Sequence, residues 1–159
     1  METNYNSFQE DIQFIDNKPM VDNSGLKFYY TTNLRKHDAG VLSVGIDPNW
    51  RHIIPPGQDR VVSEGQCVEE CTQKAFPSQG INIFGVMMRT HQIGREVKLR
   101  HIRGIEELQP IAQDMYTDSN YQEYRQLGNH VKAYPGDRLI AECTYDSSSR
   151  RAITLGEDI

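Results

Sequence analysis

The sequence predicts an all-β domain whose architecture is a two-sheet antiparallel sandwich with one or two short helices. Two observations lead to this fold class: apolar residues recur with a period of two in many short runs, and turn residues separate those runs. Segments with a helical pattern are rare and short. Many short strands with few helices are typical of a sandwich rather than of a fold in which strands and helices alternate.

The predicted strands are rich in Val, Ile, Phe, Tyr and Thr, which suit a half-buried pleated surface. They cover residues 26–31, 40–46, 60–63, 81–91, 97–102 and 139–145. Gly and Pro mark the turns between them, because Gly reaches positive φ and Pro fixes φ near the value that a turn needs. The turns fall at residues 22–25, 54–57, 77–80 and 134–137, and short helices are expected at 67–75 and 104–108.

A chain of 159 residues with 37% hydrophobic content is long enough for one core and short for two. We expect a polar N-terminal segment of interdomain type at residues 1–21, and the sandwich at 22–159, incomplete at its C-terminal end. The net charge of -5, with basic residues spread among acids, disfavours a nucleic-acid partner. The longest apolar run, 81–88, is far from the roughly 20 residues of a membrane-spanning helix.

The three cysteines, Cys67, Cys71 and Cys143, cannot all pair within the chain. Their odd number favours a piece of a longer secreted protein, although residues 1–10 carry no recognisable signal peptide. The alternative is three reduced thiols in a cytosolic protein. Cys67 and Cys71 have a spacing that chelates zinc when a second pair is present, but the sequence has no second Cys-x-x-Cys or His-x-x-x-His.

The segment 84–95 carries the most chemistry. On a strand, residues two apart share a face, so Met87, Arg89 and His91 are expected to project the same way. A His-x-His pair at the last two positions would offer two imidazoles to one metal, but the guanidinium of Arg89 has no lone pair to donate. A single histidine at a strand end is more often a surface residue than a ligand. Serine hydrolase, P-loop and dinucleotide-binding motifs are absent from the sequence.

From Asp22 to about Gly156, the chain resembles the C-terminal domain of the copper type II, ascorbate-dependent monooxygenases, the group of dopamine β-hydroxylase and tyramine β-hydroxylase. The order and spacing of many short segments carry this resemblance. They are residues 22–26, 29–31, 33–35, 39–40, 54–56, 65–67 with Cys71, 80–84, 90–91 with 94–95, 99–101, 121–125, 135–137 and 142–145. The resemblance implies a jelly-roll-like β-sandwich, one of a pair of copper domains, in a protein of the secretory pathway, vesicle lumen or extracellular space.

The resemblance also implies a reaction and a set of metal ligands. Family members use copper, ascorbate and O2 to hydroxylate a small-molecule amine such as an aryl-ethylamine, and their copper B site takes a His-x-His pair and a downstream Met. His91 occupies the second histidine place, Arg89 replaces the first, and the chain ends at Ile159 before the Met. Two copper A ligands belong to an N-terminal domain missing here, and Asn4 stands in the place of the third. His91 is the one copper candidate left, and no catalytic residue is assigned.

The resemblance gives the cysteines a role as well. The counterparts of Cys67, Cys71 and Cys143 form disulfides with cysteines nearer the C-terminus, which would lie beyond Ile159. Such a chain would be a fragment with an open sandwich edge, and open edges are prone to aggregation.

Three hypotheses about function follow. The chain is a truncated or divergent copy of a copper monooxygenase; or a pseudoenzyme that kept an amine- or glycan-binding surface, in which Arg89 binds a carboxylate; or a structural domain that contacts partners through Trp50, Tyr116 and Tyr121. We expect the chain itself to be catalytically silent.

Overall fold

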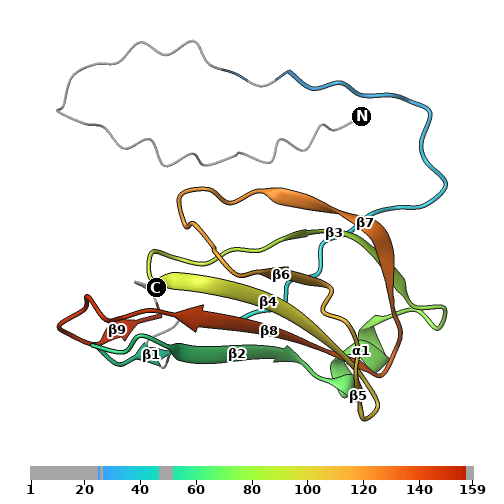
Figure 1. Cartoon of the computed structure of the whole chain (residues 1–159). Helices are drawn as coiled ribbons and strands as arrows, with labels where there is room; N and C mark the ends of the chain where they lie inside the picture. The colour runs from blue at the N-terminus through green and yellow to red at the C-terminus, as the bar shows by residue number, and fades with distance from the viewer. Residues whose placement is uncertain (1–24, 26, 47–51, 157–159) are drawn as a thin grey trace. The chain divides into compact units, whose positions relative to one another are not determined.

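The computed structural model describes Gly25, residues 27–46 and residues 52–156. The chain divides into two units, Met1–Gly40 and Val41–Ile159, and Figure 1 shows the course of the backbone through both. The expected interdomain segment 1–21 lies outside the described residues, as do Asn4 and Trp50. The boundary expected at residue 22 therefore stays a prediction.

The described residues of the first unit form neither helix nor strand. Their large side chains, including Phe28, Tyr29, Tyr30 and Leu34, are exposed. The strand expected at 26–31 is therefore wrong for residues 27–31, and the strand expected at 40–46 is also absent. A period-two pattern shows that a segment suits a sheet, but a strand forms only where a neighbouring strand supplies the hydrogen-bond ladder.

The main sheet of the second unit is antiparallel and has β8 (Asp137–Tyr145) at its centre. It pairs with β2 (Val61–Cys67) on one side and β4 (Gly94–Arg103) on the other. Two short strands, β5 (Glu106–Glu107) and β6 (Ala112–Asp114), pair with β4. Because β8 has neighbours on both edges, most of its residues are buried.

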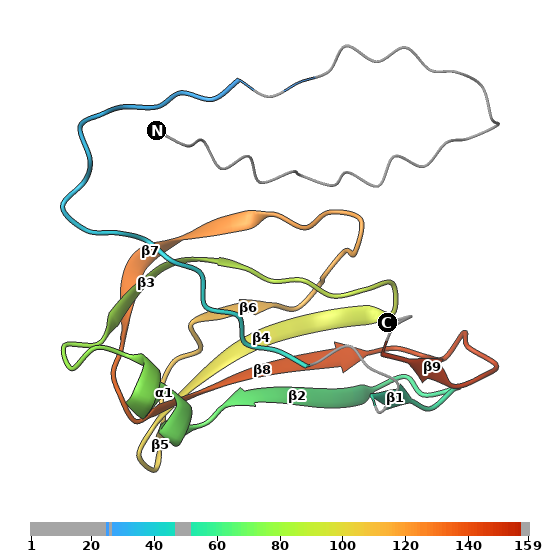
Figure 2. The same ribbon diagram turned by 180° about the vertical axis from the view of Figure 1, so that it is seen from behind.

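A second layer consists of β3 (Ile81–Met87) and β7 (Tyr124–Ala133), which pair antiparallel. Figures 1 and 2 show this ribbon lying along one face of the β2–β8–β4 sheet. A further pair, β1 (Ile53–Ile54) and β9 (Thr154–Leu155), continues beside the end of β2.

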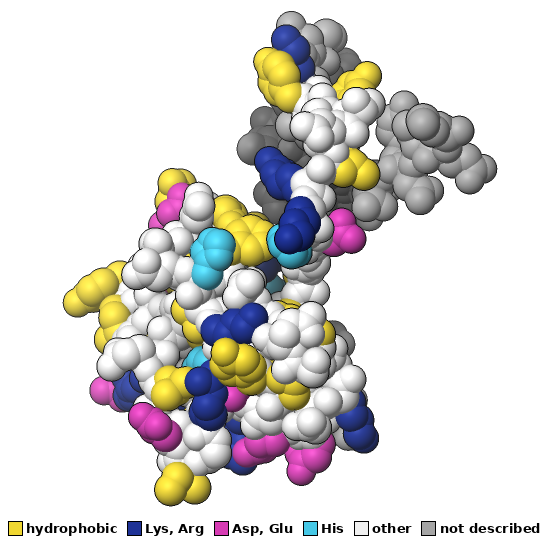
Figure 3. Space-filling model, turned by 90° about the vertical axis from the view of Figure 1, so that its right-hand side faces the viewer, with side chains coloured by type: hydrophobic (Ala, Val, Ile, Leu, Met, Phe, Trp, Pro, Cys, Tyr) yellow, Lys and Arg dark blue, Asp and Glu magenta, His cyan; other side chains and the backbone are white. Residues whose placement is uncertain are grey.

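The core lies between the two layers. One buried cluster joins Leu139 and Cys67 of the main sheet to Val86 of β3, with Ile83 and Val131 of the second layer packed against it. A second cluster is formed by Ile54, Ile93, Val97, Cys143 and Tyr145. Apolar residues from two facing sheets fill one interior, so the predicted all-β sandwich is confirmed. On the face of this unit seen in Figure 3, hydrophobic and charged side chains are interspersed.

The helix expected at 67–75 is confirmed as α1 (Glu69–Ala75). Its buried Thr72 ties it to β8, because the Thr72 hydroxyl donates to the Asp137 carbonyl oxygen at 2.6 Å and accepts from the Gly136 N–H at 3.0 Å. The helix expected at 104–108 is wrong. Gly104 has φ +59°, and the chain turns back so that Glu106 pairs with Arg103 across a two-residue loop.

One glycine in β2 allows a close backbone contact. A Cβ atom added at Gly65 would lie 1.7 Å from the carbonyl oxygen of Gly45, so the segment before β1 can cross the sheet here only because no side chain is present.

Candidate functional site

The candidate metal-binding residue, His91, lies in the loop between β3 and β4. β3 ends at Met87, so the predicted strand 81–91 is too long at its C-terminal end. Arg89 and His91 lie in this loop, and the Gly94 N–H donates to the His91 carbonyl oxygen at 2.9 Å. This turn closes the loop before β4 begins. A Cβ at Gly94 would collide with the Thr90 side chain, so glycine is required for this loop packing.

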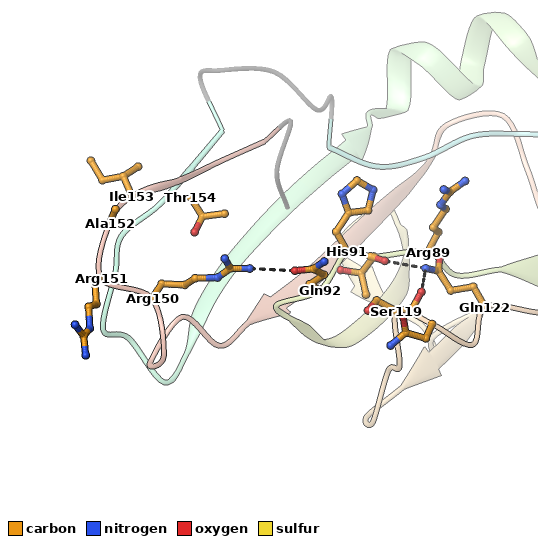
Figure 4. A pocket seen from close by; sticks show the side chains of 12 residues that line it. Arg89, His91, Gln92, Ser119, Gln122, Arg150, Arg151, Ala152, Ile153 and Thr154 are labelled. Carbon is orange, nitrogen blue, oxygen red and sulfur yellow. Dashed lines mark hydrogen bonds between the residues drawn. The ribbon is translucent and has the colours of Figure 1, made fainter. Parts of the chain in front are cut away.

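This loop lines a pocket of about 810 Å³ together with two segments that are distant in sequence (Figure 4). One precedes β7 and the other leads into β9. The lining residues are Arg89, Thr90, His91, Gln92, Ser119, Asn120, Gln122, Arg150, Arg151, Ala152, Ile153 and Thr154. The structure thus places His91 and Arg89 on the lining of one pocket, although on a loop rather than on the expected strand.

Arg89 and His91 are electrostatically coupled. Figure 4 shows their side chains extending to the same side of the loop. Partial burial lowers the pKa of His91 below its ordinary value, and the positive charge of Arg89 lowers it further. The imidazole is therefore neutral at neutral pH and can either donate or accept a hydrogen bond.

Hydrogen bonds hold the three segments together. The Gln122 amide donates to the Thr90 carbonyl oxygen at 3.0 Å and to the Ser119 carbonyl oxygen at 2.6 Å. Arg150 donates to the Gln92 side-chain oxygen at 3.4 Å. Two buried polar atoms of the lining, Thr90 Oγ1 and Gln122 Oε1, have no hydrogen-bond partner in the described structure. Buried polar atoms are rarely left unpaired, and both of these lie beneath the surface of the pocket.

The charged side chains that line the pocket are all positive. The lining contains Arg89, Arg150 and Arg151 and no Asp or Glu, although the whole chain carries a net charge of -5. None of these three arginines forms an ion pair with a described carboxylate. Six other arginines do: Arg60, Arg95, Arg100, Arg103, Arg125 and Arg138. The pocket therefore gathers positive charge that the described part of the protein leaves uncompensated.

The donor atoms of the pocket do not fit a bound copper ion. In the described ranges, no three His, Cys, Asp or Glu side chains come together in a group that would hold a metal. Met87 is 63% exposed and does not line the pocket, and Met88 packs against the core clusters. His91 is thus the one imidazole of the pocket, and its neighbour Arg89 contributes positive charge instead of a lone pair.

The cysteines lie apart from this pocket. The Cys67 and Cys71 sulfur atoms are 3.0 Å apart, and neither these residues nor the buried Cys143 form a disulfide. Burial, together with the neighbouring thiol, raises the pKa of Cys67 to about 11, and burial raises that of Cys143. The disulfides to cysteines outside the chain stay a prediction. Zinc has no third ligand beside this pair among the described His, Cys, Asp and Glu residues.

Sequence reasoning missed a buried charge cluster at the opposite end of β4. His101 and Asp137 are each 1% exposed, and His101 Nε2 lies 2.7 Å from Asp137 Oδ2. Arg103 donates to both carboxylate oxygens of Asp137 at 2.9 Å, and its guanidinium stacks over the Tyr134 ring. Two signals were present in the sequence: His101 and Arg103 are two apart and share a strand face, and Asp137 opens the next paired strand.

Comparison with known proteins agrees with the family resemblance of the sequence. Residues 37–158 match the family model described as copper type II ascorbate-dependent monooxygenase, C-terminal domain. The chain belongs to this family. Its sandwich is thus the fold of a copper monooxygenase C-terminal domain, and the pocket beside His91 lies within the matched residues.

Three relatives show the breadth of this copper monooxygenase family. MOXD1 homolog 2 of Drosophila melanogaster is 67% identical over 156 residues, covering 98% of this chain and 20% of the relative. Human DBH-like monooxygenase protein 1 is 40% identical over 140 residues, covering 86% and 23%. Dopamine beta-hydroxylase of Bos taurus is 38% identical over 135 residues, covering 85% and 22%. The chain therefore spans about a fifth of the length of these relatives.

The described residues include no helix with the length and apolar character needed to cross a bilayer.

Proposed function

We propose that this chain is the copper B-type domain of a dopamine β-hydroxylase-like monooxygenase in which the copper position no longer holds the metal. By itself the chain is then catalytically silent toward aryl-ethylamines. One observation supports the proposal: Arg89 and His91 line the same pocket. By the family resemblance, Arg89 takes the place of the first histidine of the His-x-His pair. Ascorbate, as the family reductant, would have no copper to reduce at this position.

Electrostatics supports the loss of copper binding. Two unit positive charges about 4 Å apart repel by about 4 kcal/mol at an effective dielectric constant of about 20. A guanidinium keeps its proton over the whole physiological range, so the repulsion cannot be relieved by deprotonation. His91 alone would have to hold the ion against this charge, whereas catalytic sites normally use three or more protein ligands.

Copper affinity tests the proposal directly. Cu(I) is titrated by competition with bicinchoninate into the chain, Arg89→His and His91→Ala. We expect no tight binding by the native chain and a gain of roughly 100-fold in Arg89→His, within the upper limit that the repulsion above allows. Arg151→His is the matched control, because it adds an imidazole at a lining position whose side chain points away from His91 in Figure 4. Tight binding by the native chain that His91→Ala abolishes would overturn the proposal.

Activity gives a second test. The purified chain, supplied with copper, ascorbate and O2, is assayed for hydroxylation of tyramine and dopamine. We expect no product above a blank that contains copper and ascorbate alone. Product formation that depends on the chain and is lost in His91→Ala would restore the enzyme interpretation.

We also propose that the parent protein is secretory or vesicular, as the family resemblance implies, and that its cysteines are oxidised there. An alternative function as an interaction domain has some structural support, because Tyr116 is 94% exposed and Tyr121 is 67% exposed on one loop. Exposed tyrosines are common anchors of protein interfaces.

A further inference from the structure

We infer that the loop between β8 and β9 is a site of limited proteolysis, cleaved after the pair Arg150 and Arg151 by an endoprotease that recognises paired basic residues. Hydrolysis adds water across the peptide bond between Arg151 and Ala152. Arg151 gains a carboxylate, Ala152 gains an amino group, and nothing is oxidised or reduced. This inference goes beyond the proposed function, because it does not depend on whether the domain holds copper.

The backbone around this bond is accessible. The loop projects from the end of the second unit in Figures 1 and 2. Its exposed residues are Ser148, Ser149, Arg151, Ala152 and Ile153. Arg151 and Ala152 form no backbone hydrogen bond with another described residue. Exposed loop tips of small and polar residues are the segments that proteases preferentially cut.

The loop is anchored on its N-terminal side and loosely held after that. Ser147 is buried, its hydroxyl donates to the Pro55 carbonyl oxygen at 2.6 Å, and its N–H donates to the Gln58 carbonyl oxygen at 2.8 Å. Beyond this anchor, the Arg150 N–H donates to the Ser147 carbonyl oxygen at 2.9 Å, and the Arg150 side chain reaches Gln92 only at 3.4 Å. Extending residues 149–151 into a protease cleft breaks these two hydrogen bonds and leaves the anchor intact.

The two arginines offer positive charge to a protease. Neither Arg150 nor Arg151 forms an ion pair with a described carboxylate. Arg151 points away from the other labelled groups in Figure 4. A protease specific for basic pairs must present carboxylates to both side chains, and guanidinium groups pair with carboxylates in a strong, directional fork. Ion pairs within the described part of the domain therefore do not compete with this recognition.

The sequence contains one other pair of adjacent basic residues, Arg35 and Lys36 in the first unit. It is also exposed, but the acidic Asp38 follows two residues after it. A protease cleft rich in carboxylates repels an acidic side chain so close to the bond that it cuts. The loop pair is followed by uncharged residues instead, so we expect the loop to be cut faster.

Cleavage in the loop should detach β9 and remove one wall of the pocket beside His91. β9 is held to β1 by two residues of each strand. Such a ladder is marginal once the covalent link is cut, because even an isolated two-stranded hairpin is barely stable. Residues 152–154, which line the pocket, all lie on the C-terminal side of the cut.

The experiment incubates the full chain with kexin, an endoprotease that cleaves after Lys-Arg and Arg-Arg pairs, and identifies the fragments by intact mass. We expect the first cut after Arg151, giving residues 1–151 and 152–159, before any cut after Lys36. Arg150→Gln and Arg151→Gln should each slow cleavage at this bond by about 10-fold to 100-fold, the range for loss of charged hydrogen bonds. Gel filtration of the digest should separate the peptide 152–159 from the domain.

Gln126→Arg is the matched control, because it places the same Arg-Arg pair inside β7. Gln126 is exposed and pairs with Gly85 of β3, so the variant should stay folded, which a thermal melt confirms. The strand ladder should protect this pair, and the variant should be cut in the loop alone.

Three results would overturn the inference. One is no cut after Arg151 under conditions in which kexin cleaves a synthetic peptide of residues 145–156. The others are cleavage of Arg150→Gln at the native rate, and cleavage of the pair in β7 as fast as the loop, which would show that only unfolded chains are cut. A peptide that stays with the domain through gel filtration would refute the detachment of β9. The copper titration has a separate readout, so the proposed function and this inference can fail independently.

Discussion

Replacing Asp137 with Asn should destabilise the domain far more than the same change at an exposed carboxylate. Asp137 accepts hydrogen bonds from Arg103, from the Tyr134 N–H at 2.8 Å and from His101 at 2.7 Å, and it is 1% exposed. Removing one member of a buried ion pair typically costs about 3–5 kcal/mol of stability, because the remaining charge is left buried without its opposite charge. The Arg103 side chain is 43% exposed, so water can replace part of the interaction that Arg103 loses with Asp137. We therefore expect about 3 kcal/mol for Asp137→Asn, near the lower limit.

Glu107→Gln is the matched control. Glu107 accepts two hydrogen bonds from Arg100, at 2.8 and 2.9 Å, in the same forked geometry that Arg103 makes with Asp137. The Glu107 side chain is 44% exposed, so its loss should cost less than about 1 kcal/mol. Urea unfolding followed by far-UV circular dichroism gives both free energies of unfolding. The burial argument is refuted if the two variants lose the same amount of stability.

The pH dependence of stability should follow from the same carboxylate. Burial by itself would raise the pKa of Asp137, but the hydrogen bonds from Arg103, the Tyr134 N–H and His101 hold it well below the ordinary value. The folded state therefore binds this proton less readily than the unfolded state. The contribution of Asp137 is fully present above the unfolded pKa of about 4 and is lost as the pH falls toward the folded pKa. Acid unfolding curves of Asp137→Asn should show a shallower decline between about pH 5 and 2.

Two further predictions follow from single residues. Gly65→Ala should cost about 2 kcal/mol in urea unfolding, because the new Cβ meets a backbone carbonyl at 1.7 Å, whereas Gly128→Ala, with open space around it, should change stability by less than about 1 kcal/mol. Cys71, which is exposed, should react with a disulfide reagent at pH 8 well before Cys67, whose pKa is raised to about 11, and equal rates would refute the difference.

The sequence predicted the fold class because the buried faces of β3, β4 and β8 repeat with the period of a strand. Pairing was not predictable in the same way. Residues 27–31 have a strand pattern but no strand, and β7, which pairs with β3, was overlooked because exposed polar residues break its apolar pattern. The sequence pattern predicts a helix at Gly104, whereas its positive φ makes a two-residue turn that only tertiary pairing reveals.

The candidate site was predictable only in part, for a physical reason. Arg89 and His91 are neighbours in sequence, so their shared location could be anticipated from spacing. Gln122 and Arg150 reach the pocket from loops 31 and 59 residues beyond His91 in sequence. Loop closure of that kind depends on the register of β4 with β8 and of β3 with β7, which no local pattern specifies.

The two charge centres of the domain should be energetically independent. β4 begins at Gly94, next to the His91 loop, and ends at Arg103 in the Asp137 cluster. A strand of this length spans about 30 Å at about 3.3 Å per residue, well beyond the 7–10 Å over which substitutions usually couple. Adding Asp137→Asn to Arg89→His should therefore leave the Cu(I) affinity of Arg89→His unchanged within twofold at temperatures where the double variant remains folded. A clear loss of Cu(I) affinity in that folded double variant would mean that the pocket loops depend on the buried cluster, and that stability and binding share one cooperative unit.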